Sequence, residues 1–210
     1  MPSLNIKSLI NGGITPESFM ETMEVREMRL NGIPDTKRKF REIYQEFTWE
    51  HDEDERFFGA FGEQAGVSCH ILCTDWCPDV IWNVPILFRV MEKAQVPVEV
   101  LIMEENPELM DLFLTNGGRA QPIAVFADRD GNVLGRWGGR PAYIQAVMEE
   151  FKRTHTDPQR EHMNQIYETI GNLYRAGSSY QTVVVWELKT LFAEFRDHAL
   201  VSGLLLPQAQ

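Results

Sequence analysis

Cysteine is scarce in this chain of 210 residues, and the few that occur do not form a disulfide framework. The three cysteines, Cys69, Cys73 and Cys77, lie within nine positions. An odd, crowded set of this kind is not typical of a small secreted domain stabilised by disulfides. We therefore expect reduced thiols and a cytoplasmic protein.

Positive charge is also in short supply, with 20 Lys and Arg residues against 31 Asp and Glu residues and a net charge of -11. A field of that sign opposes binding to nucleic acid and to anionic lipid surfaces. The first residues, 1–13, lack the basic and apolar regions of a signal peptide, and no apolar run is long enough to cross a bilayer. We expect neither nucleic acid nor a membrane as a partner.

What the chain does have is enough apolar sequence, 43%, to form a substantial core. In the middle of the chain, segments with the apolar period of a strand alternate with segments that have the apolar period of an α-helix. Apolar positions predict a strand over 67–73, a helix after Cys77, a strand over 96–103, a short helix from Pro107, a hairpin over 123–137 and a helix from Pro141. This β-α-β-α-β-β-α order predicts an α/β fold with a mixed sheet covered by helices on both faces.

Helices are also expected on both sides of this unit. One begins at Thr15 and Pro16 and runs to Asn31-Gly32, and a second begins near Asp35. The acidic run 51–55 is interpreted as a solvated linker, and two amphipathic helices follow residue 157. We divide the chain into an N-terminal helical extension (1–65), a central domain (66–153, Gly66 to Arg153) and a C-terminal helical hairpin (154–210).

Cys77 is the strongest candidate for chemistry, because it lies where a buried strand ends and a helix begins. Backbone N–H groups and the helix dipole favour an anion at that position and lower the pKa of a thiol. Asp79, two residues later, acts in the opposite direction, because a nearby carboxylate raises the pKa. The sequence does not decide which effect is larger.

These residues resemble the thioredoxin family. Trp76-Cys77 matches the Trp-Cys of its active site, Pro85 matches the proline eight residues after that cysteine, and Gln121-Pro122 resembles its cis-proline. The resemblance implies a thioredoxin-like fold in which the backbone at Gln121-Pro122 faces Cys77 and pairs with an extended substrate. A bacterial group of this family with a Trp-Cys-Gly/Pro-Asp motif is the most similar, and Pro78 and Asp79 complete that motif here.

Two departures from the family weaken the expected redox chemistry. Val80 stands where the resolving cysteine belongs, and Ile71 stands where thioredoxins usually have a buried aspartate. Dithiol cycling at this motif is therefore excluded. Cys73 is the alternative second thiol, although an extended strand end would hold the two cysteines too far apart for a disulfide, and a packing role is the simpler interpretation.

Three functions remain open from the sequence. The first is a monothiol thiol–disulfide oxidoreductase, in which Cys77 attacks a protein disulfide or mixed disulfide and a low-molecular-weight thiol acts as co-substrate. The second is a non-catalytic protein-binding module, and the third is a peroxide sensor. No other cofactor and no metal are expected, since Asp128, Asp130 and Asn132 fit a hairpin turn better than a calcium loop. A homodimer formed through the added helices is compatible with the sequence.

Overall fold

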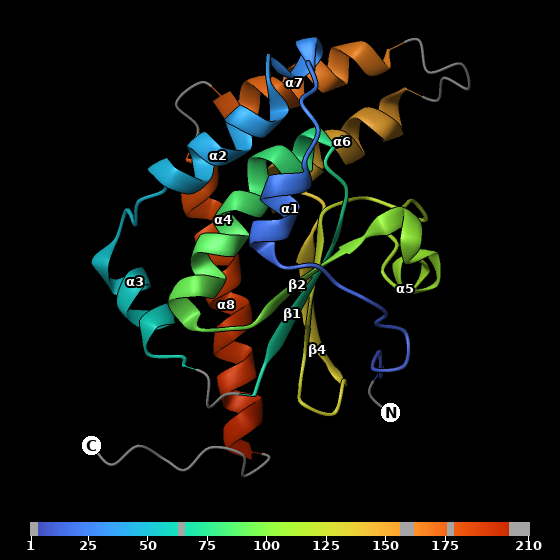
Figure 1. The fold of residues 1–210 in the computed structure, drawn as a ribbon. Coiled ribbons are helices and arrows are strands. Elements are labelled where there is room, and N and C mark those ends of the chain that lie inside the picture. The colour runs from blue at the N-terminus through green and yellow to red at the C-terminus, as the bar shows by residue number, and fades with distance from the viewer. Residues whose placement is uncertain (1–3, 63–65, 156–161, 176–178, 202–210) are drawn as a thin grey trace.

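A computed structural model describes residues 4–62, 66–155, 162–175 and 179–201. Its centre is a four-stranded sheet in the order β2-β1-β3-β4 (Figure 1). The strands are β1 (Ser68–Cys73), β2 (Val98–Ile102), β3 (Ile123–Ala127) and β4 (Val133–Gly138). The β1–β2 pair is parallel, whereas β3 pairs antiparallel with both β1 and β4. The predicted mixed sheet is thus confirmed.

Both faces of the sheet are covered, which is why β1 and β3 are buried along nearly their whole length. The larger hydrophobic cluster includes α4 (Pro78–Ala94), whose residues are almost all buried. A smaller cluster on Leu72 and Val125 includes α5 (Pro107–Asp111). A short loop, residues 74–77, connects the end of β1 to α4, so this helix starts close to the C-terminal end of an interior strand.

Three helices follow the hairpin, namely α6 (Ala142–Thr154), α7 (Met163–Arg175) and α8 (Tyr180–Val201). The long helix α8 runs beside α4 and the sheet (Figure 1). Its Phe192 and Phe195 rings pack on Phe126 of β3, with centroids 5.3 and 5.4 Å away. The C-terminal helices therefore contribute to the central core.

The N-terminal segment differs from its prediction, because α1 (Pro16–Thr22) ends well before Asn31. From Met23 the chain is extended, and its backbone N–H groups bond to other parts of the protein. The amide of Glu24 donates to Asp75 at 2.7 Å, and that of Arg26 donates to the Thr36 hydroxyl at 3.0 Å. These long-range bonds replace the helical ones, and a short 3₁₀ turn, η1 (Arg29–Asn31), follows.

The next two helices are α2 (Thr36–Glu46), which begins next to Asp35 as expected and is capped by it, and α3 (Asp52–Gly59). The interpretation of residues 51–55 as a linker is wrong, since the four acidic residues of this run form the first turn of α3. Carboxylates are favourable there because they face the positive end of the helix dipole. Phe58 of α3 contacts Phe192 of α8 at a centroid distance of 5.3 Å, which docks α3 on the core.

The division into 1–65, 66–153 and 154–210 stays a prediction. One hydrophobic cluster contains residues of all three segments, among them Phe19, Phe88 and Phe192. The first boundary adjoins residues 63–65, which lie outside the described residues.

Candidate thiol site at the start of α4

Cys77 is the N-cap residue of α4, and Pro78 occupies the first helical position. The residue is only partly exposed, and Cys69 and Cys73 are completely buried. The thiol donates to the backbone carbonyl oxygen of Gln121, with the two atoms 3.7 Å apart. The strand-to-helix junction thus presents Cys77 to the loop before β3.

The loop that faces Cys77 is held firmly. The Gln121–Pro122 peptide bond is cis. The Gln121 side chain accepts a hydrogen bond from the buried Thr74 hydroxyl at 3.0 Å, and the amide of Gly139 donates to the Pro122 carbonyl at 2.6 Å. A methyl group at Gly138 would lie 2.3 Å from that same carbonyl oxygen, so only glycine fits there. The structure therefore brings together Cys77, Gln121 and Pro122, as the resemblance implied.

Asp79, the second residue of α4, is buried and has two partners that the sequence did not reveal. Arg140, from the loop after β4, makes a two-pronged ion pair with the carboxylate at 2.7 and 3.0 Å. The hydroxyl group of Tyr174, from α7, donates a hydrogen bond to the same carboxylate at 2.9 Å. Asn83 in turn donates to the Tyr174 oxygen at 2.9 Å. This buried group, Asp79, Asn83, Arg140 and Tyr174, is called the carboxylate network below.

The surroundings of Cys77 favour the neutral thiol. Burial raises its pKa to about 12, and the Asp79 carboxylate adds to that shift. The amides of Val80 and Asp79 and the charge of Arg140 oppose it. Burial also raises the pKa of Asp79 itself, against the effects of Arg140 and Tyr174. The largest influence on the pKa of Cys77 is thus burial, which is neither of the two effects that the sequence set against each other.

The remaining residues of the predicted site are divided between surface and core. Trp76 is 48% exposed, and its indole N–H donates to Glu104 at 2.9 Å. Val80 and Cys73 are completely buried, and burial raises the pKa of the Cys73 thiol. All three cysteines are free. Cys73 is thus enclosed by the core at the end of β1.

No group of three or more His, Cys, Asp or Glu side chains in the described part of the chain could hold a metal ion. The Asp128 carboxylate accepts hydrogen bonds from the backbone amides of Asp130 and Asn132, both at 2.9 Å, which is a turn within the hairpin. Among the described helices, none is both long and apolar enough to cross a membrane.

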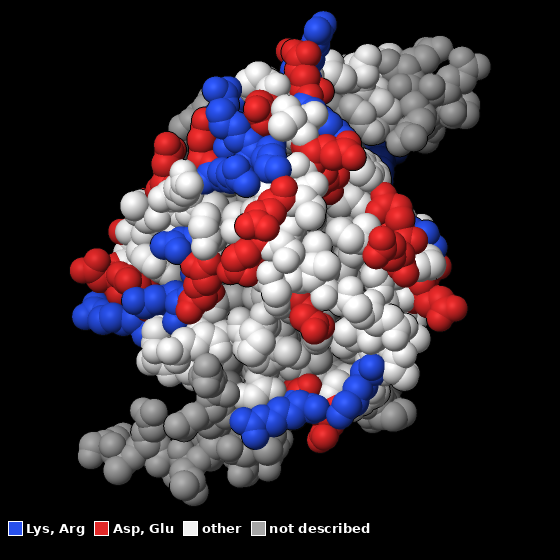
Figure 2. Space-filling model, in the orientation of Figure 1, with Lys and Arg blue, Asp and Glu red and all other residues white. Residues whose placement is uncertain are grey.

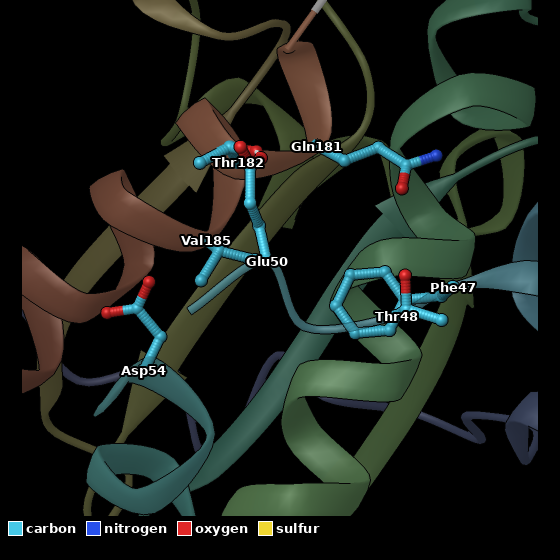
Figure 3. A pocket seen from close by; sticks show the side chains of 7 residues that line it. All are labelled: Phe47, Thr48, Glu50, Asp54, Gln181, Thr182 and Val185. Carbon is cyan, nitrogen blue, oxygen red and sulfur yellow. Dashed lines mark hydrogen bonds between the residues drawn. The ribbon is translucent and has the colours of Figure 1, made fainter. Parts of the chain in front are cut away.

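A separate pocket of about 310 Å³ lies between the α2–α3 segment and the first turns of α8 (Figure 3). The side chains that line it are Phe47, Thr48, Glu50, Asp54, Gln181, Thr182 and Val185. The Thr182 hydroxyl donates to Glu50 across it. None of these residues belongs to the thiol site, so the pocket contributes nothing to its chemistry.

Comparisons with known proteins agree with this fold. A family model described as thioredoxin matches residues 14–152. A protein of unknown function from Pseudomonas aeruginosa is 15% identical, with a TM-score of 0.56 over 92% of this chain and 98% of that one. An HIV epitope-scaffold is 14% identical, with a TM-score of 0.54 over 90% of this chain and 98% of that one. At these identities the two structures show the fold alone. The comparison with curated proteins found no match.

Proposed function

The chain belongs to the thioredoxin family, and from that premise we propose that it is a monothiol thiol–disulfide oxidoreductase with Cys77 as its nucleophile. The observation that carries the proposal is the 3.7 Å contact between the Cys77 sulfur and the carbonyl oxygen of Gln121. An extended substrate that pairs with the backbone of this loop would have its disulfide beside the sulfur of Cys77.

The reaction proceeds in two exchange steps. The Cys77 thiolate attacks the small-thiol sulfur of a mixed disulfide, which forms a new disulfide with the small thiol and releases the target cysteine as a thiolate. A second small thiol, as its thiolate, then attacks the small-thiol sulfur of that adduct and releases Cys77. In total, the mixed disulfide and one molecule of the small thiol are converted into the free target cysteine and the disulfide of the small thiol, and the two released thiolates take up the protons that the two attacking thiols lose.

Val80 and Cys73 account for the need for an external thiol. Val80 has no sulfur at the resolving position, and Cys73 is enclosed by the core. Because the co-substrate must be available in reduced form, we propose a reducing compartment such as the cytoplasm as the site of action.

The raised pKa of Cys77 sets the expected speed of this reaction. With a pKa of about 12, the thiolate fraction at pH 7 is about one in 100,000. A thiolate of high pKa is intrinsically more nucleophilic, which recovers part of that loss. We therefore expect slow exchange at neutral pH and faster exchange as the pH rises.

The raised pKa of Cys77 also favours a second candidate function, a binding module in which Cys77 does not react. In this case, the face formed by Trp76, Cys77 and Gln121 would recognise a protein segment without covalent exchange. The two functions make opposite predictions about whether Cys77 forms an adduct.

The test is reduction of a peptide whose single cysteine is linked to a small neutral thiol, in the presence of excess reduced thiol. We expect turnover that rises between pH 7 and pH 9 and a small-thiol adduct on Cys77 in the intact protein's mass. Cys77→Ser should abolish both, whereas the matched control Cys73→Ala should retain them. Turnover of the folded Cys77→Ser protein equal to that of the wild type would exclude the oxidoreductase and leave the binding module.

A further inference from the structure

An open cleft of about 510 Å³ adjoins Trp76, the residue directly before the nucleophile. Three segments form it, namely the end of α1, the β1–α4 loop and the residues after β2. Its apolar lining comes from Phe19, Met23, Trp76 and Ile102. Neither Cys77 nor Gln121 lines it, so the cleft is distinct from the thiol site although it adjoins that site through Trp76.

The rim of this cleft is acidic, with the carboxylates of Glu24, Asp75, Glu104 and Glu105. Arg26 pairs with both Glu24 and Asp75, each at 2.7 Å. Glu104 accepts the indole N–H of Trp76. One guanidinium thus faces two of the carboxylates, and the rim keeps an excess of negative charge. Figure 2 shows acidic side chains gathered over the segment that leads into α5, on this face of the molecule.

The cleft exists because the chain departs from a helix at Met23. The extended backbone there places Glu24 against the β1–α4 loop, where its amide bonds to Asp75. A continued helix would have carried Glu24 in another direction. The segment 19–24 therefore supplies one wall of the cleft, and the β1–α4 loop and the residues at the end of β2 supply the others.

We propose that this cleft is a specificity site for the substrate, and that it binds a basic segment, rich in Lys or Arg, close in sequence to the substrate cysteine. The proposal rests on the oxidoreductase function above, since it assigns the class of substrate for the same reaction. A substrate whose cysteine meets Cys77 passes along the exposed Trp76 ring into the cleft.

The chemistry of the lining selects Lys and Arg over other residues. Their aliphatic stems cover apolar surface while the charged head stays at a polar rim. The stem would lie on Trp76 and Ile102, and the charged head would lie among Glu24, Glu104 and Glu105. Complementary charge of this kind changes mainly association rate and specificity, and it weakens as salt is added.

The test compares two nine-residue peptides, each with a central cysteine linked to the same small neutral thiol. One has lysines in the flanking positions, and the other has glutamines. We expect the lysine peptide to react about tenfold faster at low ionic strength, with the ratio falling toward one at high salt. Each rate is normalised to the rate of the small neutral disulfide alone, measured on the same variant.

Two charge-matched variants show whether the cleft causes the preference. Glu24→Gln/Glu105→Gln removes two rim charges and should lower the ratio to about twofold or less. Glu168→Gln/Glu194→Gln removes two exposed charges on α7 and α8 and should leave the ratio unchanged. Equal loss in both variants, or no preference in the wild type, would overturn the assignment, since overall charge would then explain the data.

A binding measurement separates this inference from the proposed function. Peptides with serine in place of cysteine cannot exchange, and their affinities are measured by calorimetry. Tighter binding of the lysine peptide, lost in Glu24→Gln/Glu105→Gln, supports the cleft even if no disulfide is turned over. Turnover with equal affinities for both peptides refutes the cleft and leaves the oxidoreductase intact.

Discussion

Replacing Asp79 with asparagine should make Cys77 more reactive, because the carboxylate raises the pKa of the thiol and Arg140 lowers it. The substitution removes the first charge and keeps the second. A carboxylate within about 4–6 Å shifts a pKa by roughly 1–3 units. A fall of about two units raises the thiolate fraction about 100-fold, but the lower basicity reduces nucleophilicity, so the rate should rise about tenfold.

The cost of this substitution lies in Arg140, whose side chain is only 15% exposed. Without Asp79 its charge is buried and unpaired, which costs on the order of 3–5 kcal/mol. Asp79→Asn/Arg140→Gln removes both charges and avoids that penalty. Because Asp79 influences the thiol more than Arg140 does, the double variant should react faster than the wild type but more slowly than Asp79→Asn.

The assay is alkylation of Cys77 by iodoacetamide at pH 7, followed by peptide mapping with mass spectrometry. Only samples with the wild-type circular dichroism spectrum are compared. Asp111→Asn, which removes an exposed carboxylate paired with Arg119, is the matched control and should leave the rate unchanged. Equal or slower alkylation in both folded Asp79 variants would refute the electrostatic argument.

Three further predictions concern the Cys77 thiol, the Tyr174 hydrogen bond and the Phe192 ring. In the wild type, the alkylation rate of Cys77 should rise about tenfold per unit between pH 7 and pH 10, since its pKa of about 12 lies above that window; a plateau below pH 9 would contradict this. Tyr174→Phe leaves Asp79 with one hydrogen bond fewer and should lower the free energy of unfolding by about 1–3 kcal/mol, measured with urea. Phe192→Ala should cost about 3–5 kcal/mol in the same assay, whereas Trp186→Ala, at a position 63% exposed, should change stability by no more than about 0.5 kcal/mol.

The central fold could be predicted because its signals are local. The alternation from Val67 to Cys73 specifies a buried strand, and the turn residues 128–132 specify a hairpin, whatever the rest of the chain does. The end of α1 could not be predicted in this way. The amides of Glu24 and Arg26 leave the helical pattern for partners 51 and 10 residues away, and no local pattern identifies such partners.

The candidate thiol site could also be located from the sequence, because its signals are local. The partners of Asp79 could not be predicted, because they are distant in sequence. Cys77 and Asp79 are two residues apart, so their opposition is visible in the sequence. Arg140 and Tyr174 reach Asp79 from 61 and 95 residues further along the chain. Tyr174 falls on the apolar stripe of its helix, where an aromatic residue is expected to fill space. Its hydroxyl group can bond to Asp79 only when α7 lies next to the start of α4.

Residues distant in sequence thus determine the surroundings of Cys77. The Asp79 carboxylate is held by one partner from the loop after β4 and one from the C-terminal hairpin, and that carboxylate raises the pKa of Cys77. At the other flank of the thiol, the extended segment after α1 forms a wall of the acidic cleft beside Trp76. Helix α7 and the segment after α1 thus both reach the start of α4, one through the carboxylate next to Cys77 and one through the surface beside Trp76. In the proposed monothiol reaction, the rate would depend on the thiolate fraction of Cys77 and on which disulfides are held against it, so these two contacts would be its main means of control.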